Sequence, residues 1–404
     1  MAGAPLPLVG CRVLDATDEL GVYATRLLVE LGAEVVRLEP LAGDPLRRYP
    51  PFADADGRVS LYHLHFNAGK RSLTLDLTRP AAHGWLNRLL TTCHALVESG
   101  PVHGLLSTRI GLTAMRAARP DLVVVSVTPF GLHGPYRERT GGDLVVAAHS
   151  GLLWLNGRPD GPPHRPGGEQ AAHMAGLLAA NATLLGLFHQ RRTGQGCHLD
   201  VPATFAASLA TLQTANANYV TWHGRIPARR GMGLPPFRHI FPAADGWVAL
   251  TALPGQWPNL VRLLCDHAAA ADLADPAYRD DAYRYERSEH ITAVIEAFTS
   301  RYPKQYLFKV AQEAGVACAP VNTAADLAAD PFLHGRGWFR PVWHADLGRV
   351  LRYPGPPFRL GNPGGAGAAL HPAPGQGADN RAVWVDELGM DAATFATLCA
   401  TEVR

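Results

Sequence analysis

The sequence is poor in charge for its length and has little to attract a polyanion. Of its 404 residues 18% are charged, and 37 basic against 35 acidic residues give a formal net charge of +2. Only three of the basic residues are lysine (Lys70, Lys304 and Lys309), and the others are arginine. Nucleic-acid binding without sequence preference needs a dense basic field, so we expect no nucleic-acid partner.

The cysteines are too few and too scattered for a disulfide framework. None of the six is spaced from another as CxxC. This usage is typical of a reduced, cytoplasmic chain with small buried thiols. The opening residues MAGAPLPLVG lack a basic region followed by a long apolar run, so we expect no secretion signal.

Long hydrophobic runs are also scarce. The stretch 171–188 is nearly all apolar, but it contains His173, Asn181 and Thr183 and leads directly into HQRRTG. It barely reaches the length of about 18 residues that a membrane span needs, so we predict a buried core helix and no membrane partner. The hydrophobic content of 47% is ample for large cores, and the length suits about two domains.

Three familiar motifs are absent. No GxGxxG follows the first predicted strand, which disfavours NAD or FAD. The junction at residues 15–18 is either an anion site at a strand end or a helix N-cap by Thr17 or Asp18. The sequence contains no GxSxG, the motif of the nucleophile elbow in α/β-hydrolases. The basic run 67–72 lacks P-loop spacing, which leaves a phosphate-contacting loop or a solvated loop.

One group of basic side chains suggests a phosphate-binding site. Arg47, Arg48, Lys70, Arg71 and Arg109 fall in loops or at element ends, and guanidinium groups match phosphate oxygens, so together they could hold a phosphorylated carrier.

His63 and His65 alternate in LYHLHF. On a strand these side chains would share one face, as two metal ligands do. No third ligand of suitable spacing is near, so we expect a structural role for both histidines and no metal.

The order of elements indicates an α/β fold. Predicted strands are Cys11–Ala16, Ala33–Pro40, Leu73–Leu77, His94–Ser99, Leu122–Gly131 and Cys197–Val201. Predicted helices are Tyr23–Leu31, Pro80–Leu90, a pattern that begins at Arg109 and is closed by Pro120, and Glu169–Arg192. Continuous apolar strands separated by helices favour a parallel sheet covered on both faces. Right-handed crossovers then give a Rossmann-like large domain.

The second half is organised differently. The segment 223–236 is rich in Arg, Gly and Pro and predicts a loop or linker. Trp247–Leu253 predicts a strand, 255–330 is mostly helical, 331–375 is rich in Pro and Gly, and Ala382–Ala400 predicts a final helix. We therefore expect a large domain over 1–222, an inserted smaller α+β domain over 223–330, and a tail over 331–404 that returns to the first.

Several segments, in this order, resemble the family III CoA-transferases, the group of formyl-CoA transferase, carnitine CoA-transferase and α-methylacyl-CoA racemase. The matching segments are VLDAT…YATRLLVELGAEVVRLEPLAGDPLR, FNAGKRSLTLDL, RIGL…RPDLVVVSVTPFGLHGPY, HMAGLLAANATLLGLFHQRRTGQGCHLDV, ADPFLHGRGWF and RYPGPPFRL. The resemblance implies a two-domain fold whose chains pair as interlocked rings. Coenzyme A would be a substrate, as an acyl thioester, and no cofactor would be bound permanently.

The resemblance carries some binding residues over and loses others. Arg109 and Leu75 match CoA contacts of the family, and Lys70 and Arg71 match its basic loop. Two early His and Gln contacts fall on Asp18 and Leu20 and are lost.

The family nucleophile is missing as well. The family's catalytic Asp falls four residues before Gly176, at Ala172, and a methyl group cannot attack a thioester. The racemase His falls near Gly142, which argues against racemisation. Glu169 or His173 could be recruited, but Glu169 would need displacement by about one helical turn. Alternatively, Glu169 is an acid in the first turn of the helix, where its negative charge interacts favourably with the helix dipole.

Three interpretations follow. The preferred one is a non-catalytic subunit of a heteromeric CoA-transferase acting on acyl-CoA and a carboxylic acid. It resembles benzylsuccinate CoA-transferase, which pairs an Asp-bearing subunit with a sister chain that lacks the Asp. The first alternative is an active transferase, homodimeric or heteromeric, with a relocated carboxylate such as Glu169. The second is a non-enzymatic acyl-CoA-binding or assembly protein.

Overall fold

The apolar runs predicted as strands form one parallel sheet in the computed structural model, which describes residues 6–211, 220, 224, 226, 229, 233–234, 238–252, 254–358 and 370–399. The strands are β1 (Arg12–Ala16), β2 (Glu34–Glu39), β3 (Arg71–Thr74), β4 (Ala95–Ser99), β5 (Val123–Thr128) and β6 (His198–Pro202). They lie in the order β3-β2-β1-β4-β5-β6, and every neighbouring pair is parallel. The predicted α/β fold with a Rossmann-like sheet is confirmed.

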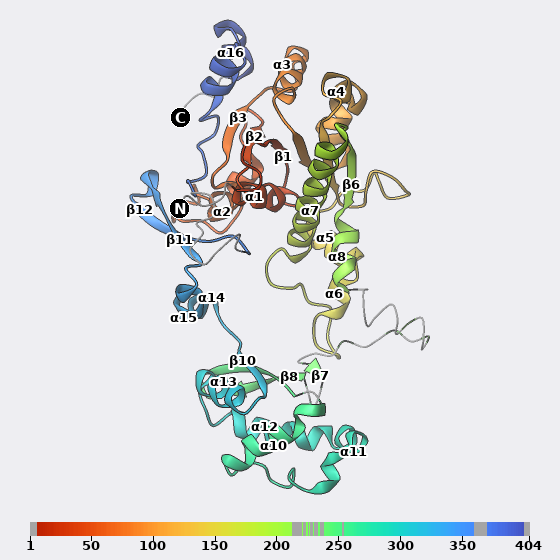
Figure 1. Cartoon of the computed structure of the whole chain (residues 1–404), viewed down its shortest axis with the longest axis vertical. Coiled ribbons are helices and arrows are strands. Elements are labelled where there is room, and N and C mark those ends of the chain that lie inside the picture. The colour runs from red at the N-terminus through yellow and green to blue at the C-terminus, as the bar shows by residue number, and fades with distance from the viewer. Residues whose placement is uncertain are drawn as a thin grey trace. The chain divides into compact units, whose positions relative to one another are not determined.

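Helices cover both faces of this sheet (Figure 1). They are α1 (Val22–Glu30), α2 (Leu61–Asn67), α3 (Pro80–Leu90), α4 (Leu112–Ala118), α5 (Asp143–His149), α6 (Leu152–Leu155), α7 (Gln170–Thr193), α8 (Ala203–Thr211) and α16 (Ala392–Leu398). Successive strand residues point to opposite faces, so Val13 and Val35 pack with α1 and α7, whereas Leu14 and Val36 pack with α3 and the C-terminal segment. The sheet is therefore buried on both sides.

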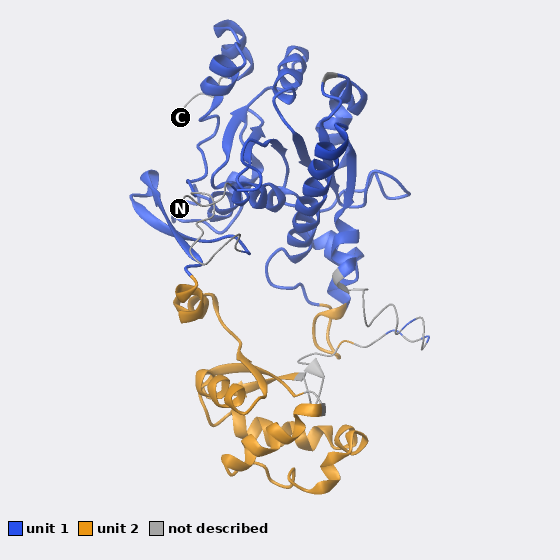
Figure 2. Ribbon diagram, in the orientation of Figure 1, with its two compact units in different colours: residues 1–154, 164–227, 337–404 blue, residues 155–163, 228–336 orange. Residues whose placement is uncertain are grey.

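The chain divides into two compact units (Figure 2). Unit 1 comprises residues 1–154, 164–227 and 337–404, and unit 2 comprises residues 155–163 and 228–336. Unit 1 contains the parallel sheet and, near its C-terminal end, the hairpin β11 (Phe339–His344) with β12 (Arg349–Pro354).

Unit 2 is built on an antiparallel sheet in the order β10-β9-β8-β7. Its strands are β7 (Gly233–Leu234), β8 (Arg238–Ala243), β9 (Gly246–Thr251) and β10 (Ala317–Pro320), and its helices are α10 (Trp257–Asp266), α11 (Asp281–Glu286), α12 (Ser288–Thr299), α13 (Lys304–Glu313), α14 (Ala324–Ala329) and α15 (Pro331–Gly335). Phe241, Val248 and Leu250 of the sheet pack against Leu260 and Ile295 of the helices. The smaller α+β domain is thus present.

The long apolar helix α7 belongs to the core of unit 1. By length and composition it could cross a membrane, but more than half of its most apolar window is buried inside the protein. Ala175 and Ala179 lie in the same buried cluster as Val123 and Val125 of β5. The prediction of a core helix over this stretch is confirmed.

The C-terminal segment closes the β3 edge of the sheet. Asp379 accepts a hydrogen bond from the Ser72 backbone N–H at 2.9 Å, and Asn380 accepts one from the Thr74 N–H at 2.8 Å. The Trp384 indole N–H donates to the Thr74 carbonyl at 3.2 Å. Residues 379–384 therefore supply the hydrogen-bond partners that a seventh strand next to β3 would otherwise supply.

Two local predictions around α1 and α2 were wrong. His63 and His65 lie on α2 and not on a strand, because the Ser60 hydroxyl caps that helix by accepting from the His63 N–H at 3.0 Å. Neither Thr17 nor Asp18 caps α1. The helix begins at Val22, and Gly21 occupies the capping position without a side-chain bond.

Of the predictions for the second half, one needs correction and one falls largely outside the described residues. The final helix over Ala382–Ala400 is interrupted: a π-helical segment ends at Glu387, Gly389 adopts φ +69°, and α16 follows. The region 331–375 contains the β11–β12 hairpin. Most of the predicted linker 223–236 lies outside the described residues, and its Gly233–Leu234 forms β7.

Candidate functional site

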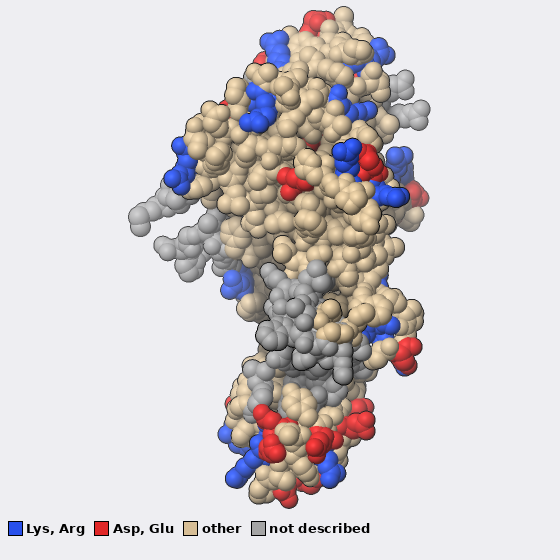
Figure 3. Space-filling view, turned by 90° about the vertical axis from the view of Figure 1, so that its right-hand side faces the viewer, with Lys and Arg blue, Asp and Glu red and all other residues tan. Residues whose placement is uncertain are grey.

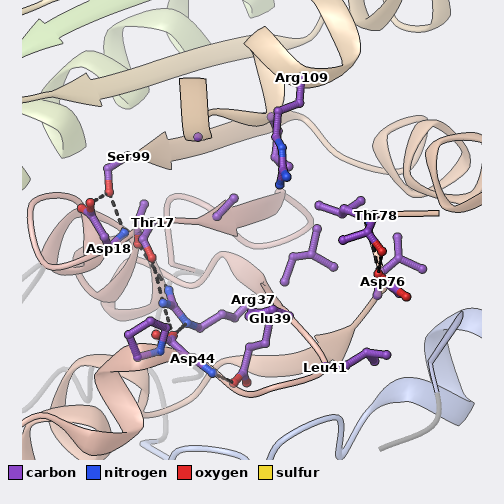
Figure 4. Close-up of a pocket in the computed structure, with 18 residues that line it drawn as sticks. Thr17, Asp18, Arg37, Glu39, Leu41, Asp44, Asp76, Thr78, Ser99 and Arg109 are labelled. Carbon is purple, nitrogen blue, oxygen red and sulfur yellow. Dashed lines mark hydrogen bonds and ion pairs between the residues drawn. The ribbon is translucent and has the colours of Figure 1, made fainter. Parts of the chain in front are cut away.

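A pocket of about 480 Å³ opens at the carboxyl ends of four strands (Figure 4). Its walls come from the segments that follow β1, β2 and β3 and from Ser99 at the end of β4. The strand order reverses between β1 and β4, and open α/β sheets bind ligands at such a reversal. The fold alone therefore marks this pocket as the candidate binding site.

The pocket brings together two residues predicted from the sequence, Leu75 and Arg109. Leu75 is buried and gives the pocket an apolar wall. Arg109 is exposed and points into the space between Ser99 and Thr78 (Figure 4). No side-chain hydrogen bond or ion pair joins Arg109 to another part of the described chain, so its guanidinium is available for an anionic ligand.

The other arginine in the pocket, Arg37, is already engaged. Its guanidinium contacts both carboxylate oxygens of Asp15 at 3.1 Å and also pairs with Asp44. Burial alone would lower the pKa of Arg37, but the two carboxylates raise it. Arg37 therefore holds the loops after β1 and β2 in place, and its charge is compensated inside the protein.

Lys70 is likewise engaged and does not line the pocket. Its ammonium lies 2.7 Å from Asp15, 2.8 Å from the Thr25 hydroxyl and 3.0 Å from the Asn67 amide oxygen, and none of its side chain is exposed. Burial lowers the pKa of Lys70 to about 8, against the opposing effect of Asp15. An ammonium has three protons, and all three have partners here.

Arg71 and the two earlier arginines also lie away from the pocket. Arg71 forms ion pairs with Glu34 and Glu387, both at 2.8 Å, and with Asp379 at 3.2 Å. Arg47 pairs with Glu39 at 2.7 Å, and Arg48 is exposed. Arg71 thus joins the basic loop to the C-terminal segment that closes the β3 edge.

Asp18 and Leu20, at which the resemblance predicts that CoA contacts are lost, have different surroundings. Asp18 lines the pocket, and its carboxylate bonds to the Ser99 hydroxyl and to the Leu20 backbone N–H. Burial raises the pKa of Asp18, although the Ser99 bond acts against this. The side chain of Leu20 is buried in the core beneath α1 and does not reach the pocket.

Ala172 lies in the first turn of α7, where it is 3% exposed. Its backbone N–H donates to Asp143 Oδ1 at 3.1 Å, and Asp143 Oδ2 pairs with Arg165 at 3.1 Å. Asp143 is buried at the start of α5 and so caps the α7 N-terminus from a second helix. Both of its oxygens are engaged, and the methyl group of Ala172 has no lone pair to offer.

Glu169 directly precedes α7 and makes no capping bond with its side chain. Its backbone carbonyl accepts from the His173 N–H at 2.9 Å and from His173 Nδ1 at 2.6 Å. Burial raises the pKa of the Glu169 carboxyl, and Asp143 adds to this, while His173 and Arg165 oppose it. Glu169 is half-buried, and its backbone is fixed at the start of α7, before the first turn.

Two residues of this region escaped the sequence analysis. Asp143 follows a pair of glycines and opens a helix, a pattern typical of an acid at a helix N-terminus, and this signal could have found it. Glu19 follows Asp18 in the loop after β1, and a Cβ atom at Gly142 would lie only 2.5 Å from its Oε1. That contact spans more than a hundred residues and leaves no mark in the sequence.

Of the histidines predicted to be structural, His63 is buried and His65 is half-buried. The His63 ring nitrogen Nδ1 lies 3.0 Å from the Asn67 amide, and burial lowers the pKa of His63 to about 3, with Arg47 adding to the effect. Burial also lowers the pKa of His65, to about 4. Within the described ranges, no three His, Cys, Asp or Glu side chains are placed to hold a metal ion.

Known proteins resemble this chain over nearly its whole length. A family model described as CoA-transferase family III matches residues 8–380. Succinyl-CoA:(R)-benzylsuccinate CoA-transferase subunit BbsE of Thauera aromatica is 36% identical over 368 residues, which cover 87% of each chain. Succinate–glutarate CoA-transferase of Agrobacterium fabrum is 32% identical and covers 85% of this chain and 87% of its own. The structure of a CAIB/BAIF family protein from Brucella suis matches 95% of this chain and 100% of that one, with a TM-score of 0.82 at 26% identity.

Proposed function

Because the chain belongs to CoA-transferase family III, we propose that it is the non-catalytic subunit of a heteromeric enzyme that moves CoA between an acyl-CoA and a carboxylic acid. The membership confirms the family predicted from the sequence. The observation that carries the proposal is Ala172, whose methyl group stands where the family resemblance places the nucleophilic carboxylate.

The proposed chemistry of the family explains why this position decides the matter. A carboxylate oxygen attacks the thioester carbon, the C–S bond breaks, and a mixed anhydride forms as CoA thiolate leaves. The thiolate then attacks the enzyme carbonyl of the anhydride, the acyl acid departs as a carboxylate, and an enzyme–CoA thioester remains for the acceptor acid. Every step passes through the enzyme carboxylate, and reactivity depends steeply on its distance from the thioester.

CoA binding is a separate matter from catalysis, and the pocket supports it. We propose that Arg109 contacts a phosphate group of CoA and that Leu75 contacts an apolar part of it. Lys70 and Arg71, which match the family's basic loop, would act indirectly by fixing that loop, since their charges are compensated by Asp15 and by acids around Arg71.

A partner chain is supported by the outer surface of unit 1. Leu185 and Phe188 of α7 and Phe205 of α8 are each more than half exposed. Figure 3 shows the side of the molecule on which α8 lies in Figure 1, and uncharged side chains predominate on it. Apolar faces of this kind mark interaction sites, and the relative from Thauera aromatica is itself named as a subunit. We propose that a homologous chain bearing the catalytic Asp covers this face, in an interlocked pair.

The proposal is tested by a CoA-exchange assay with succinyl-CoA as donor and benzylsuccinate or glutarate as acceptor. We expect no transfer by the purified chain alone and transfer when an Asp-bearing homologue from the same source is added. Glu169→Gln should not change either result, and Glu289→Gln, on the exposed face of α12 in unit 2, is the matched control. A chain that transfers CoA unaided and loses this with Glu169→Gln would overturn the proposal and establish the relocated carboxylate.

A further inference from the structure

We propose that Glu19 closes the acyl end of the CoA pocket in this chain, so that restoring a carboxylate at Ala172 is not sufficient to restore chemistry. This inference rests on the proposed function and adds a second, independent reason for the silence of the site. It concerns a residue that neither the sequence motifs nor the pocket lining single out.

The first support is position. Asp18 lines the pocket, and Glu19 is the next residue in the loop after β1. The Glu19 carboxylate lies against Gly142, because a Cβ atom there would be 2.5 Å from Oε1. Gly142 is followed by Asp143, whose Oδ1 is 3.1 Å from the backbone nitrogen of Ala172. Glu19 is therefore linked to the pocket through its neighbour Asp18 and to the turn that contains Ala172 through Gly142 and Asp143.

The second support is that Gly142 and Glu19 fit each other. Any side chain at position 142 would occupy the space that the Glu19 carboxylate fills. The resemblance to the racemase branch places a histidine near this position, and such a ring could not coexist with Glu19 in its present conformation. The glycine at position 142 thus leaves the room that the Glu19 carboxylate occupies.

The third support is charge. Among the described residues, none forms an ion pair or a side-chain hydrogen bond with Glu19, and its charged neighbours Asp18, Glu169 and Asp143 have the same sign. Arg165 lies in this region as well, but it is paired with Asp143. Burial raises the pKa of Glu19, and the three acids raise it further. The surroundings of Glu19 thus contain three further carboxyl groups, and the described residues offer it no ion-pair partner.

Two consequences follow for the chemistry. A carboxylate introduced at position 172 would join Glu19, Asp143 and Glu169, and like charges at short range favour the protonated form, which is a poor nucleophile. An acyl group that carries its own carboxylate, such as succinyl, would also meet the Glu19 charge in a partly desolvated space. Neutralising Glu19 relieves both effects without changing the size of the side chain.

The test compares Ala172→Asp, Glu19→Gln and the double variant in the full-length chain, with its partner chain present where one co-purifies. Each is incubated with succinyl-CoA, and the enzyme–CoA thioester is quantified by intact mass, which resolves the chains. We expect no adduct in this chain with Glu19→Gln alone. The double variant should form at least tenfold more adduct than Ala172→Asp. The control double variant, Ala172→Asp with Glu138→Gln, changes an exposed acid far from Glu19 in the sequence and should match Ala172→Asp alone.

The outcomes are separable. CoA affinity, measured by calorimetry on every variant, shows that the pocket is intact. Equal adduct in Ala172→Asp and in the double variant would overturn the inference, and so would no adduct in either while CoA still binds. Failure of the proposed function has a different signature, namely adduct or transfer by the unmodified chain.

Discussion

Replacing Lys70 with methionine should lower the stability of unit 1 and leave CoA affinity nearly unchanged. Methionine keeps the length of the side chain and removes its charge. The variant separates two roles for the basic loop: a direct phosphate contact, which the family resemblance implies, and the support of the loop, which the contacts of the ammonium favour.

The size of the effect follows from what the ammonium leaves behind. Asp15 is completely buried, and it would keep Arg37 at 3.1 Å but lose the closer partner at 2.7 Å. Removing one member of a buried ion pair costs about 3–5 kcal/mol, and the remaining Arg37 places Lys70→Met near the lower value, about 3 kcal/mol. For a unit of this size that corresponds to a fall in Tm of about 5 °C.

Thermal and urea unfolding measure the stability, and calorimetry with CoA measures the affinity. Lys309→Met is the matched control, because Lys309 is exposed and forms no ion pair in the described part of the chain. We expect the control to change the free energy of unfolding by less than about 0.5 kcal/mol. A Lys70→Met protein of unaltered stability whose CoA affinity falls tenfold would refute the structural role.

Three further outcomes are expected. Arg109→Ala should weaken CoA binding by about 1.5–3 kcal/mol, roughly tenfold to a hundredfold, in calorimetry, whereas Arg116→Ala, an exposed arginine outside the pocket, should not. Burial would raise the pKa of Asp15, but Lys70 and Arg37 hold it well below its usual range, so the contribution of Asp15 to stability is present above about pH 4 and is lost as the pH falls further. In urea unfolding, the difference in the free energy of unfolding between wild type and Asp15→Asn should therefore narrow below about pH 4. A difference that stays constant with pH would contradict this reasoning. Phe188→Glu should reduce the mass of the assembly in light scattering, while Phe332→Glu, at a residue of unit 2 that is also more than half exposed, should not. An unchanged assembly with Phe188→Glu would argue against an interface on α7.

The sheet could be predicted because its signal is local and repeated. Val123–Thr128 is buried along its entire length, and a continuous apolar run of this kind is typical of a parallel strand covered on both faces. Helix α2 was missed because LYHLHFN alternates as a strand does, while its buried residues Tyr62, His63, Phe66 and Asn67 have helical spacing. Seven residues are too few for the apolar pattern to distinguish a strand from a helix, and the Ser60 cap favours the helix.

The site was predictable only in part, for a different physical reason. Leu75 and Arg109 came from the family resemblance, and the pocket gathers both. The role of Lys70 depends on Asp15, 55 residues earlier, and a basic loop looks the same in sequence whether its charge is free or compensated. The contact of Glu19 with Gly142 is equally remote, since it depends on how two loops meet at the sheet edge.

The C-terminal segment that closes the β3 edge has a consequence for how the chain is made. During translation Ser72 and Thr74 leave the ribosome more than three hundred residues before Asp379 and Asn380, which supply their hydrogen-bond partners. Until synthesis is complete, the nascent sheet presents an open strand edge, the feature through which unfinished chains associate wrongly. A chain shortened by a premature stop or by proteolysis at the C-terminus would therefore keep an unpaired, aggregation-prone strand edge next to Leu75 of the pocket. We expect cellular quality control to treat such a chain as misfolded.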